Sequence, residues 1–251
     1  MPAAKTLSVV LITLNASKHL RECLESVAWA GEIVVLDGGS SDSTESIASE
    51  FHARFMVEPD WQGFGVQKNR ALAFATGDWV LSLDADEVVT PALRAEIEAV
   101  LHAPRAEVFE MPRLSSFCGH WMRHGGWWPD PVTRLFRRGA ARFSDDAVHE
   151  RLLHQGAPAR LGAHLLHYSY DDFEQALDKM NRYSSLGAGQ AHRDGKRATP
   201  LTAWARGAWA FVRTYVLRLG LLDGSAGWML ALYNAQTTYY KYIKLWKLGS
   251  R

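Results

Sequence analysis

Apolar and polar positions in the first part of the chain follow two alternating patterns. One is a short, continuous apolar run rich in Val, Ile and Leu, which is typical of a strand buried on both faces. The other repeats apolar residues at helical spacing, as at Leu20, Leu24 and Val27. Strands that alternate with helices in this way predict a βαβ parallel sheet. We predict strands at residues 7–13, 32–36, 54–57 and 77–83, and helices after residue 17, from residue 41 or 42 to 51, over 65–75, and from an N-cap at Thr90 to about 101.

The pattern changes in the second half of the chain. Residues 107–166 form short extended pieces with Gly, Pro and Trp, and three helices are predicted beyond them, at about 171–191, 201–219 and 226–248. The expected organisation is an α/β domain over 1–168 and a helical extension over 169–251. The longest uncharged stretch, 224–240, contains Asn234, Gln236 and two threonines and falls short of the roughly 20 apolar residues that span a bilayer. We predict no transmembrane helix.

Composition indicates a globular protein that is not built to coat nucleic acid. Of 251 residues, 47% are hydrophobic and 22% are charged, and the net charge is only +1. Residues 199–251 nevertheless carry seven Lys or Arg against the single acid Asp223. The two cysteines, Cys23 and Cys118, form no C-x-x-C pair, which favours a reducing, cytoplasmic compartment.

Polar clusters follow three of the predicted strands, at residues 13–15, 37–42 and 84–87. In parallel sheets, ligands bind beyond the carboxyl ends of the strands, where these clusters meet. Asp84 and Asp86, one residue apart, suit Mg²⁺ or Mn²⁺, which commonly leave their other positions to water and phosphates. The alternative is an ordinary D-x-D turn that caps a helix or faces solvent.

Five segments in this order resemble family 2 glycosyltransferases of the GT-A fold, which have a Rossmann-like, mostly parallel sheet. They read SVVLITLN, EIVVLDGGSSDST, WQGFGVQKNRAL, GDWVLSLDADE and WWPDPVTRLFRR, with VHERL after them. They are most similar to the subgroup that adds sugars to the lipopolysaccharide inner core, the β-1,4-glucosyltransferases. The resemblance implies an inverting, metal-dependent transfer of a sugar, expected to be glucose, from a UDP-sugar to a lipid-linked acceptor, with Mg²⁺ or Mn²⁺ as cofactor.

The resemblance also implies roles on the donor side. Asp37 contacts uracil or ribose, Asp84 faces the ribose, and Asp86 binds the metal that bridges the diphosphate. The remaining positions implied to contact the nucleotide sugar are Thr13, Asn15, Lys68, Asn69 and Ala85. Lys68, Asn69 and Arg70 alternatively belong to a solvated helix face. Ala16 stands where many members carry Glu, so any contact from that acid is absent.

An inverting transfer needs a carboxylate to deprotonate the acceptor hydroxyl. The family spacing places this base at Glu150, with Asp130 second and Asp145 or Asp146 after them; alternatively, Glu150 forms an ion pair with Arg151 or Arg134. Further expected contacts to diphosphate or acceptor are His149, Arg134, Trp127, Trp128 and His167. The tryptophans could instead be core residues, and His167 could be structural.

The C-terminal segment combines tryptophans with basic residues, which suits a helix on an anionic membrane surface. The tryptophans are Trp204, Trp209, Trp228 and Trp246, and the basic residues include Arg206, Arg213, Arg218, Lys241, Lys244 and Lys247. We expect a peripheral protein on the inner face of the cytoplasmic membrane. The alternative is a helical pair that packs on the catalytic domain. Both can hold, because one face of a helix can pack on the domain while the other contacts the membrane.

Two other functions fit part of the sequence. Residues 81–88 also match the nucleophile strand of haloacid-dehalogenase-like, Mg-dependent phosphatases, in which Asp84 would be phosphorylated and Asp145 and Asp146 would form the later acidic pair. That motif normally opens its domain, whereas two βα units precede it here. The other function is a non-catalytic module that binds nucleotide sugars. A dehydrogenase is disfavoured because no G-x-G-x-x-G follows the first strand.

Overall fold

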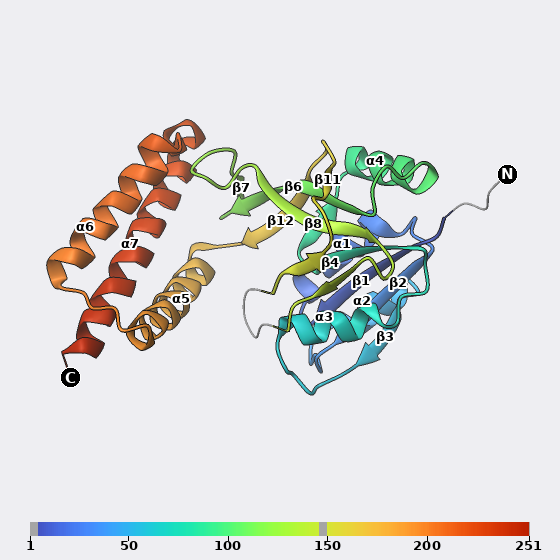
Figure 1. The fold of residues 1–251 in the computed structure, drawn as a ribbon, viewed down its shortest axis with the longest axis horizontal. Helices are drawn as coiled ribbons and strands as arrows, with labels where there is room; N and C mark the ends of the chain where they lie inside the picture. The colour runs from blue at the N-terminus through green and yellow to red at the C-terminus, as the bar shows by residue number, and fades with distance from the viewer. Residues whose placement is uncertain (1–4, 146–149, 251) are drawn as a thin grey trace. The chain divides into compact units, whose positions relative to one another are not determined.

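The computed structural model describes residues 5–145 and 150–250, and the chain divides into two compact units (Figure 1). The first, here called the sheet unit, combines the chain up to Arg113 with Asp130–His167. The second, here called the helical unit, combines Leu114–Pro129 with the chain from Tyr168 onward. Two excursions of the chain therefore build the helical unit, the first of them inside the region in which the sequence shows short extended pieces.

Four parallel strands form the part of the sheet that the sequence predicts. They are β1 (Leu7–Thr13), β2 (Glu32–Asp37), β3 (Arg54–Val57) and β4 (Trp79–Asp84), in the order β3-β2-β1-β4. The sheet continues from β4 through antiparallel β8 (Asp130–Arg137) to β6 (Val108–Phe117), β12 (Leu165–Tyr170) and β5 (Glu87–Val89). Short strands β7 (His120–Trp121) and β11 (Ala159–Arg160) pair with β6, and β9 (Ala141–Phe143) pairs with β10 (Leu152–His154).

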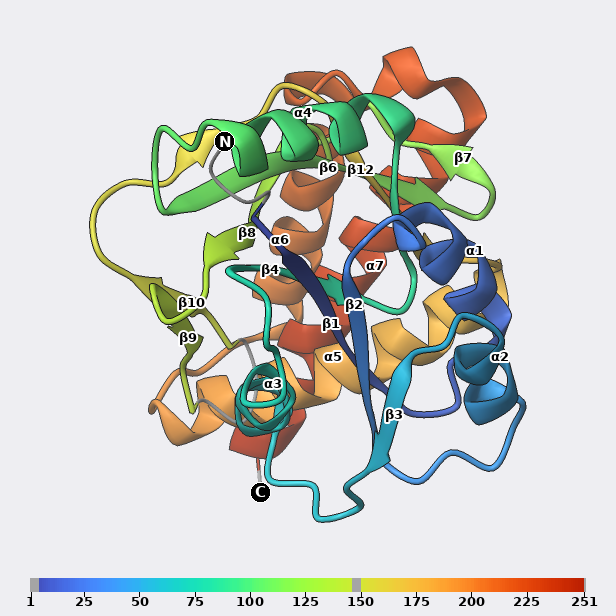
Figure 2. The ribbon, with the colours of Figure 1, turned by 90° about the vertical axis from the view of Figure 1, so that its right-hand side faces the viewer.

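Helices cover both faces of the parallel strands, which explains their continuous apolar runs (Figure 2). Val9 and Leu11 pack with α1 (Ser17–Val27), α2 (Thr44–Glu50) and α4 (Pro91–His102), whereas Val10 packs with α3 (Phe64–Leu72). Because side chains alternate along a strand, a strand covered on both faces is apolar at every position. Thr90 caps α4 as predicted, since its side chain accepts a hydrogen bond from Leu93 N.

The helical unit contains α5 (Phe173–Arg193), α6 (Pro200–Val212) and α7 (Gly224–Gly249). One predicted helix, over 201–219, ends early: α6 stops at Val212, a π turn follows over Arg213–Leu217, and Leu219 is left-handed at φ 57°. A 3₁₀ turn (Gly220–Asp223) then leads into α7. Gly207 allows α6 to approach α7 closely, because a Cβ there would lie 3.1 Å from the Ala235 carbonyl oxygen. No helix in the described parts of the chain is long and apolar enough to cross a membrane.

Strand β4 lies between β1 and β8, and its apolar side chains are buried in the core. Leu81 is fully buried in it, so Leu81→Ala is expected to lower the free energy of unfolding by about 3 kcal/mol, because it leaves a cavity in the core. Leu153→Ala, the same change at a side chain 38% exposed in β10, is the control, with an expected effect within about 0.5 kcal/mol. Urea unfolding followed by circular dichroism measures both, and equal effects would contradict the burial of β4.

Candidate active site

The carboxyl ends of β1, β2 and β4 bring the three polar clusters to one edge of the sheet. In the strand register Thr13 lies opposite Asp37, and Ile12 lies opposite Asp84. The convergence predicted from the sequence is therefore confirmed by the register. What the register leaves open is how the side chains of the three clusters are paired.

The Asp37 carboxylate organises the loop that follows β2. It is 1% exposed, and it accepts hydrogen bonds from Gly39 N at 2.8 Å, Ser40 N and Ser40 Oγ at 2.6 Å, and Thr13 Oγ1 at 2.7 Å. Burial alone would raise the pKa of this carboxyl, but the hydrogen bonds from Ser40, Thr13 and Gly39 outweigh it and hold the pKa below its ordinary value. These four bonds use the acceptor capacity of a carboxylate, so a contact with uracil or ribose requires one of them to be exchanged.

Asn15 ties the first polar cluster to the second. Its backbone is left-handed at φ 51°, its N–H donates to Ser40 Oγ at 2.7 Å, and its Oδ1 accepts from Ser41 N at 2.9 Å. Thr13 and Asn15 therefore both hold the Asp37 loop in place. Asn tolerates the left-handed conformation better than most residues, which gives this position a structural reason for its side chain.

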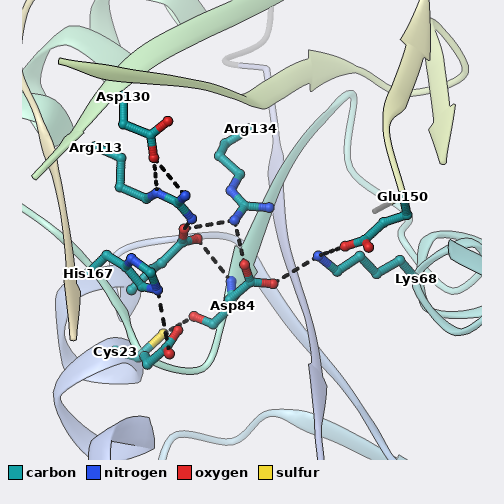
Figure 3. Close-up of polar contacts among 10 residues, drawn as sticks. Cys23, Lys68, Asp84, Arg113, Asp130, Arg134, Glu150 and His167 are labelled. Carbon is teal, nitrogen blue, oxygen red and sulfur yellow. Dashed lines mark hydrogen bonds and ion pairs between the residues drawn. The ribbon is translucent and has the colours of Figure 1, made fainter. Parts of the chain in front are cut away.

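Lys68 joins the third polar cluster to a residue far along the chain (Figure 3). Its ammonium lies 2.9 Å from Asp84 Oδ1 and 2.9 Å from Glu150 Oε1, and the residue is only 5% exposed. Lys68 is therefore not part of a solvated helix face. Glu150 pairs with this lysine and not with Arg151 or Arg134, the partners considered from the sequence.

Helix α3 is anchored to the chain that leads to Glu150. Asn69 donates from Nδ2 to the Phe143 carbonyl oxygen at 2.9 Å, and its Oδ1 accepts from Phe143 N at 2.8 Å. A Cβ at Gly65 would overlap the Ser144 carbonyl oxygen, so the backbones meet there with no room for a side chain. Asn69 thus holds β9 against the helix that carries Lys68. Arg70 instead bonds to Asp60 at the surface.

Arg134 binds Asp84 on the side away from Lys68. Its Nη2 donates to Asp84 Oδ2 and, at 2.7 Å, to Glu87 Oε1, while Glu87 Oε2 accepts from Asp84 N at 3.0 Å. Burial by itself would raise the pKa of Asp84, but Arg134 and Lys68 outweigh that effect and bring the pKa far below its ordinary value. Although burial opposes it, the neighbouring Asp84 and Glu87 carboxylates raise the pKa of Arg134.

Asp130, the second candidate base, is held by Arg113. Arg113 Nε and Nη2 both bond to Asp130 Oδ2, at 3.0 and 2.7 Å, and Nη1 lies 3.3 Å from Glu87 Oε1 (Figure 3). Glu87, which is fully buried, pairs with both Arg113 and Arg134. Asp130 is therefore connected to the D-x-D segment through two arginines. Glu150 is connected to the same segment more directly, through Lys68 alone.

Asp86 is held by fewer partners than Asp84. Its Oδ2 lies 3.6 Å from His167 Nε2, and its side chain is 38% exposed. Ala85, between the two acids, packs against the hydrophobic core. Both oxygens of Asp84 face cations, so Asp86 is the carboxylate of the pair that is open to a metal ion.

The charge of this cluster fits a divalent cation. Three cationic side chains face five carboxylates, so the described residues leave two formal negative charges. They are Lys68, Arg113 and Arg134 on one side and Asp84, Asp86, Glu87, Asp130 and Glu150 on the other. Residues 5–145 and 150–250 contain no group of three His, Cys, Asp or Glu side chains that would bind a metal by itself. Such a site suits Mg²⁺ or Mn²⁺, which take one or two carboxylates and share the rest with phosphates.

Two of the other expected contacts belong to the helical unit. Trp127 belongs to the helical unit, where its ring packs 5.7 Å from Phe117 and 5.8 Å from Tyr170. Trp128, also in that unit, is half-buried and precedes Pro129 through a cis peptide bond. His149 and Asp146 lie outside the described residues.

Sequence reasoning assigned no individual role to three residues around the D-x-D segment. Glu87 and Arg113 carry the buried ion pairs described above, and the Cys23 thiol lies 3.8 Å from the Asp84 carbonyl oxygen. Burial, followed by the nearby carboxylates, raises the pKa of that thiol. A signal existed for two of them: Glu87 is an acid before two valines in a buried strand, and Arg113 is a cation inside the long strand β6.

Comparison with known proteins places these residues in a family context. Residues 8–157 match the family model described as Glycosyl transferase family 2. The lipopolysaccharide core biosynthesis glycosyltransferase LpsC of Rhizobium meliloti (strain 1021) is 34% identical over 205 residues, which cover 76% of this chain and 73% of LpsC. An uncharacterized glycosyltransferase of Rickettsia prowazekii (strain Madrid E) is 27% identical over 96% of this chain and 87% of its own. The structure of glucosyl-3-phosphoglycerate synthase from Mycobacterium tuberculosis with Mn²⁺, UDP and glucosyl-3-phosphoglycerate matches 45% of each chain at 27% identity and a TM-score of 0.39.

The paired charges make a prediction about stability and pH. Asp84→Asn removes the shared partner of Lys68 and Arg134 and is expected to lower the free energy of unfolding at pH 7 by about 2 kcal/mol, less than for a fully buried pair because the side chain is 32% exposed. The pKa of Asp84 is depressed by folding, so its contribution is present above the unfolded pKa of about 4 and is lost as the pH falls below it. The difference between wild type and Asp84→Asn should therefore shrink between pH 4 and pH 2, measured by urea unfolding.

Asp86→Asn is the matched control for that experiment. Asp86 touches neither Lys68 nor Arg134, so the expected change in unfolding free energy is within about 0.5 kcal/mol. Equal losses for the two variants, or a difference that does not vary with pH, would contradict the proposed pairing of Asp84.

Proposed function

The chain belongs to glycosyl transferase family 2, and from this premise we propose that it transfers a sugar from a UDP-sugar to a lipid-linked acceptor, such as the lipopolysaccharide inner core, in one inverting displacement. Family membership confirms the resemblance seen in the sequence and the GT-A fold class that it implied. It also makes the protein a glycosyltransferase, so the phosphatase alternative is withdrawn. A module that binds nucleotide sugars without turnover remains an outcome that experiments can detect.

The observation that carries the proposal is the Lys68 bridge. One buried ammonium contacts Asp84, at the end of β4, and Glu150, 66 positions later in the chain. Glu150, the first candidate for the base, therefore lies close to the D-x-D segment, the first candidate for binding the donor. Proximity of this kind is what a direct displacement requires, because the acceptor oxygen must meet the sugar carbon in line with the departing diphosphate.

On the donor side, Asp86 and His167 are the side chains that would hold Mg²⁺ or Mn²⁺. When bound, the ion would stabilise the negative charge of the departing UDP. Lys68 and Arg134 would orient Asp84 toward the ribose, since each fixes one of its oxygens. The buried Nε of Arg134 has no hydrogen-bond partner among the described residues, which supports a role for this arginine near phosphate oxygens.

On the acceptor side, Glu150 would take the proton from the attacking hydroxyl. As that oxygen bonds to the anomeric carbon, the bond from this carbon to UDP breaks and the anomeric configuration inverts. The Lys68 contact uses Oε1, so the ion pair itself does not occupy Oε2. Asp130 is the second candidate, although Arg113 donates two hydrogen bonds to one of its oxygens. Trp127 and Trp128 remain proposed acceptor contacts because aromatic faces stack on sugar rings.

The donor sugar is proposed to be glucose, and a lipid-linked acceptor would keep the enzyme at the inner face of the cytoplasmic membrane. The test is a panel of nucleotide sugars incubated with the purified protein, Mg²⁺ or Mn²⁺ and truncated inner-core lipopolysaccharide, with UDP release as the readout. Release that requires both metal and acceptor supports the transferase. Binding of a UDP-sugar with no release on any acceptor would instead support the module.

Asp86→Ala tests the metal site. We expect UDP release to fall by about 10³-fold or more, because the charge on the leaving diphosphate loses its stabilisation. The measurement is the initial rate at several metal concentrations, together with metal binding by calorimetry. Asp194→Ala, which removes an aspartate of the helical unit that lies 3.7 Å from Lys196, is the control and should retain wild-type rates.

Glu150→Gln tests the base. Turnover should fall by about 10²- to 10⁴-fold, while the dissociation constant for the UDP-sugar stays unchanged, because the substitution keeps the shape of the side chain and removes its ability to accept a proton. Asp130→Asn is the matched comparison. Full activity in Glu150→Gln, with a loss in Asp130→Asn, would transfer the role of base to Asp130.

A further inference from the structure

Helix α6 carries an exposed apolar stripe along its length. Leu201, Trp204 and Trp209 are 74%, 66% and 55% exposed, and Val212 and Val216 continue the stripe into the π turn. Their spacing is that of one helix face. The opposite face, with Ala203 and Gly207, is buried. Within the helical unit, then, α7 covers one side of α6 and leaves an apolar side uncovered.

The stripe ends in a turn that is also apolar. Four exposed leucines lie from the end of the π turn to the start of α7: Leu217, Leu219, Leu221 and Leu222. Leu219 has the left-handed conformation that glycine or asparagine normally supplies. Turns at the protein surface usually contain polar residues. A leucine at φ 57° also adopts a backbone conformation that is unfavourable for its side chain. These residues therefore have a use outside the packing of the unit.

The turn is held firmly despite its exposure. Asp223 accepts hydrogen bonds from Arg123 N at 3.2 Å and His124 N at 2.8 Å, and its Oδ1 lies 2.8 Å from His124 Nδ1. Gly125 N donates to the Arg218 carbonyl oxygen at 2.8 Å. The apolar surface is thus preformed, and binding through it costs little ordering.

Charge decides which partner fits. No acidic residue occurs between Asp194 and Asp223, while five basic residues do: Lys196, Arg197, Arg206, Arg213 and Arg218. Arg206 and Arg213 are exposed and lie along one edge of the stripe, and Arg206 also lies over the Tyr242 ring of α7. The Asp223 carboxylate is engaged by the 123–124 backbone. A second copy of the chain would bring arginines against arginines across a twofold interface. An anionic lipid surface accepts both the apolar stripe and the positive flank.

We propose that the outward face of α6 and the leucine-rich turn after it form an anchor that inserts into the interfacial region of an anionic membrane. The helix lies in the membrane plane, with Trp204 and Trp209 at the level of the headgroups and the arginines beside lipid phosphates. This inference deepens the proposed function, and it rests on that function only for the membrane that carries the acceptor.

The test is co-sedimentation of the full chain with vesicles of phosphatidylcholine, with and without phosphatidylglycerol. The double variant Trp204→Ser/Trp209→Ser should bind the anionic vesicles at least about tenfold more weakly than wild type. Arg206→Gln/Arg213→Gln should bind anionic vesicles about thirtyfold more weakly than wild type and bind neutral vesicles equally well. Each basic residue near an anionic surface raises the affinity by about fivefold, so two residues account for this factor. Tyr183→Ser/Leu186→Ser changes two side chains of α5 that are also more than half exposed, and this control should bind like wild type.

The outcomes separate this proposal from the enzymatic one. UDP release on a deacylated, water-soluble acceptor should be the same for wild type and all three variants, whatever their vesicle binding. Unchanged vesicle binding in the tryptophan variant, or an equal loss in the α5 control, would overturn the anchor. So would a dimer in solution that the tryptophan substitutions dissociate while vesicle binding is absent, because the stripe would then be an interface between two copies.

Discussion

The arrangement of the sheet unit depends on one constraint: ionic side chains shielded from water must be paired. Lys68 and Arg134 are almost completely buried, and both bind Asp84, one at each carboxylate oxygen. Removing one partner from such a pair leaves an uncompensated charge, which costs about 3–5 kcal/mol in a fully buried setting. The D-x-D segment therefore cannot move independently of α3 or β8, and its first carboxylate serves as the point that locks three elements together.

The same constraint connects stability to chemistry. Lys68 shares Asp84 with Arg134, so one carboxylate faces two cations, and Glu150 supplies a further negative charge. The interaction that neutralises a buried ammonium therefore also positions the proposed base. Asn69 and Gly65, on the same helix, hold the chain before Glu150 through backbone contacts. Fully buried Glu87 has a similar role for Arg134 and Arg113. The excess of carboxylates over cations then leaves a negative site, and among the described ion pairs Asp86 is the member whose partner is a histidine and not a lysine or arginine.

Much of the fold could be predicted because its signals are local. A strand covered on both faces is predicted by the continuous apolar run at Val9, Val10 and Leu11. The start of a helix is predicted by Thr90 followed by Pro91. The helix predicted over 201–219 forms, but its α-helical part ends at Val212 and a π turn completes it to Leu217. That end depends on the turn at Leu219 and on the hydrogen bonds that Asp223 accepts from residues 123 and 124. Those contacts join parts of the chain about a hundred residues apart, and no window of sequence contains them.

The sequence by itself determined the family, the parallel sheet and the edge at which Asp37, Asp84 and Asp86 gather. The motifs carry the family, and alternating strand and helix periods predict parallel strands whose carboxyl ends the polar clusters follow. Only the tertiary structure decided the partners. A lone Lys68 in a helix is equally consistent with solvent, phosphate or an ion pair. Folding selected Asp84 and Glu150 because it buries the lysine and brings both carboxylates within 2.9 Å of its ammonium. The exposed stripe on α6 was likewise decided in three dimensions, because which face of a helix stays uncovered depends on where α7 packs.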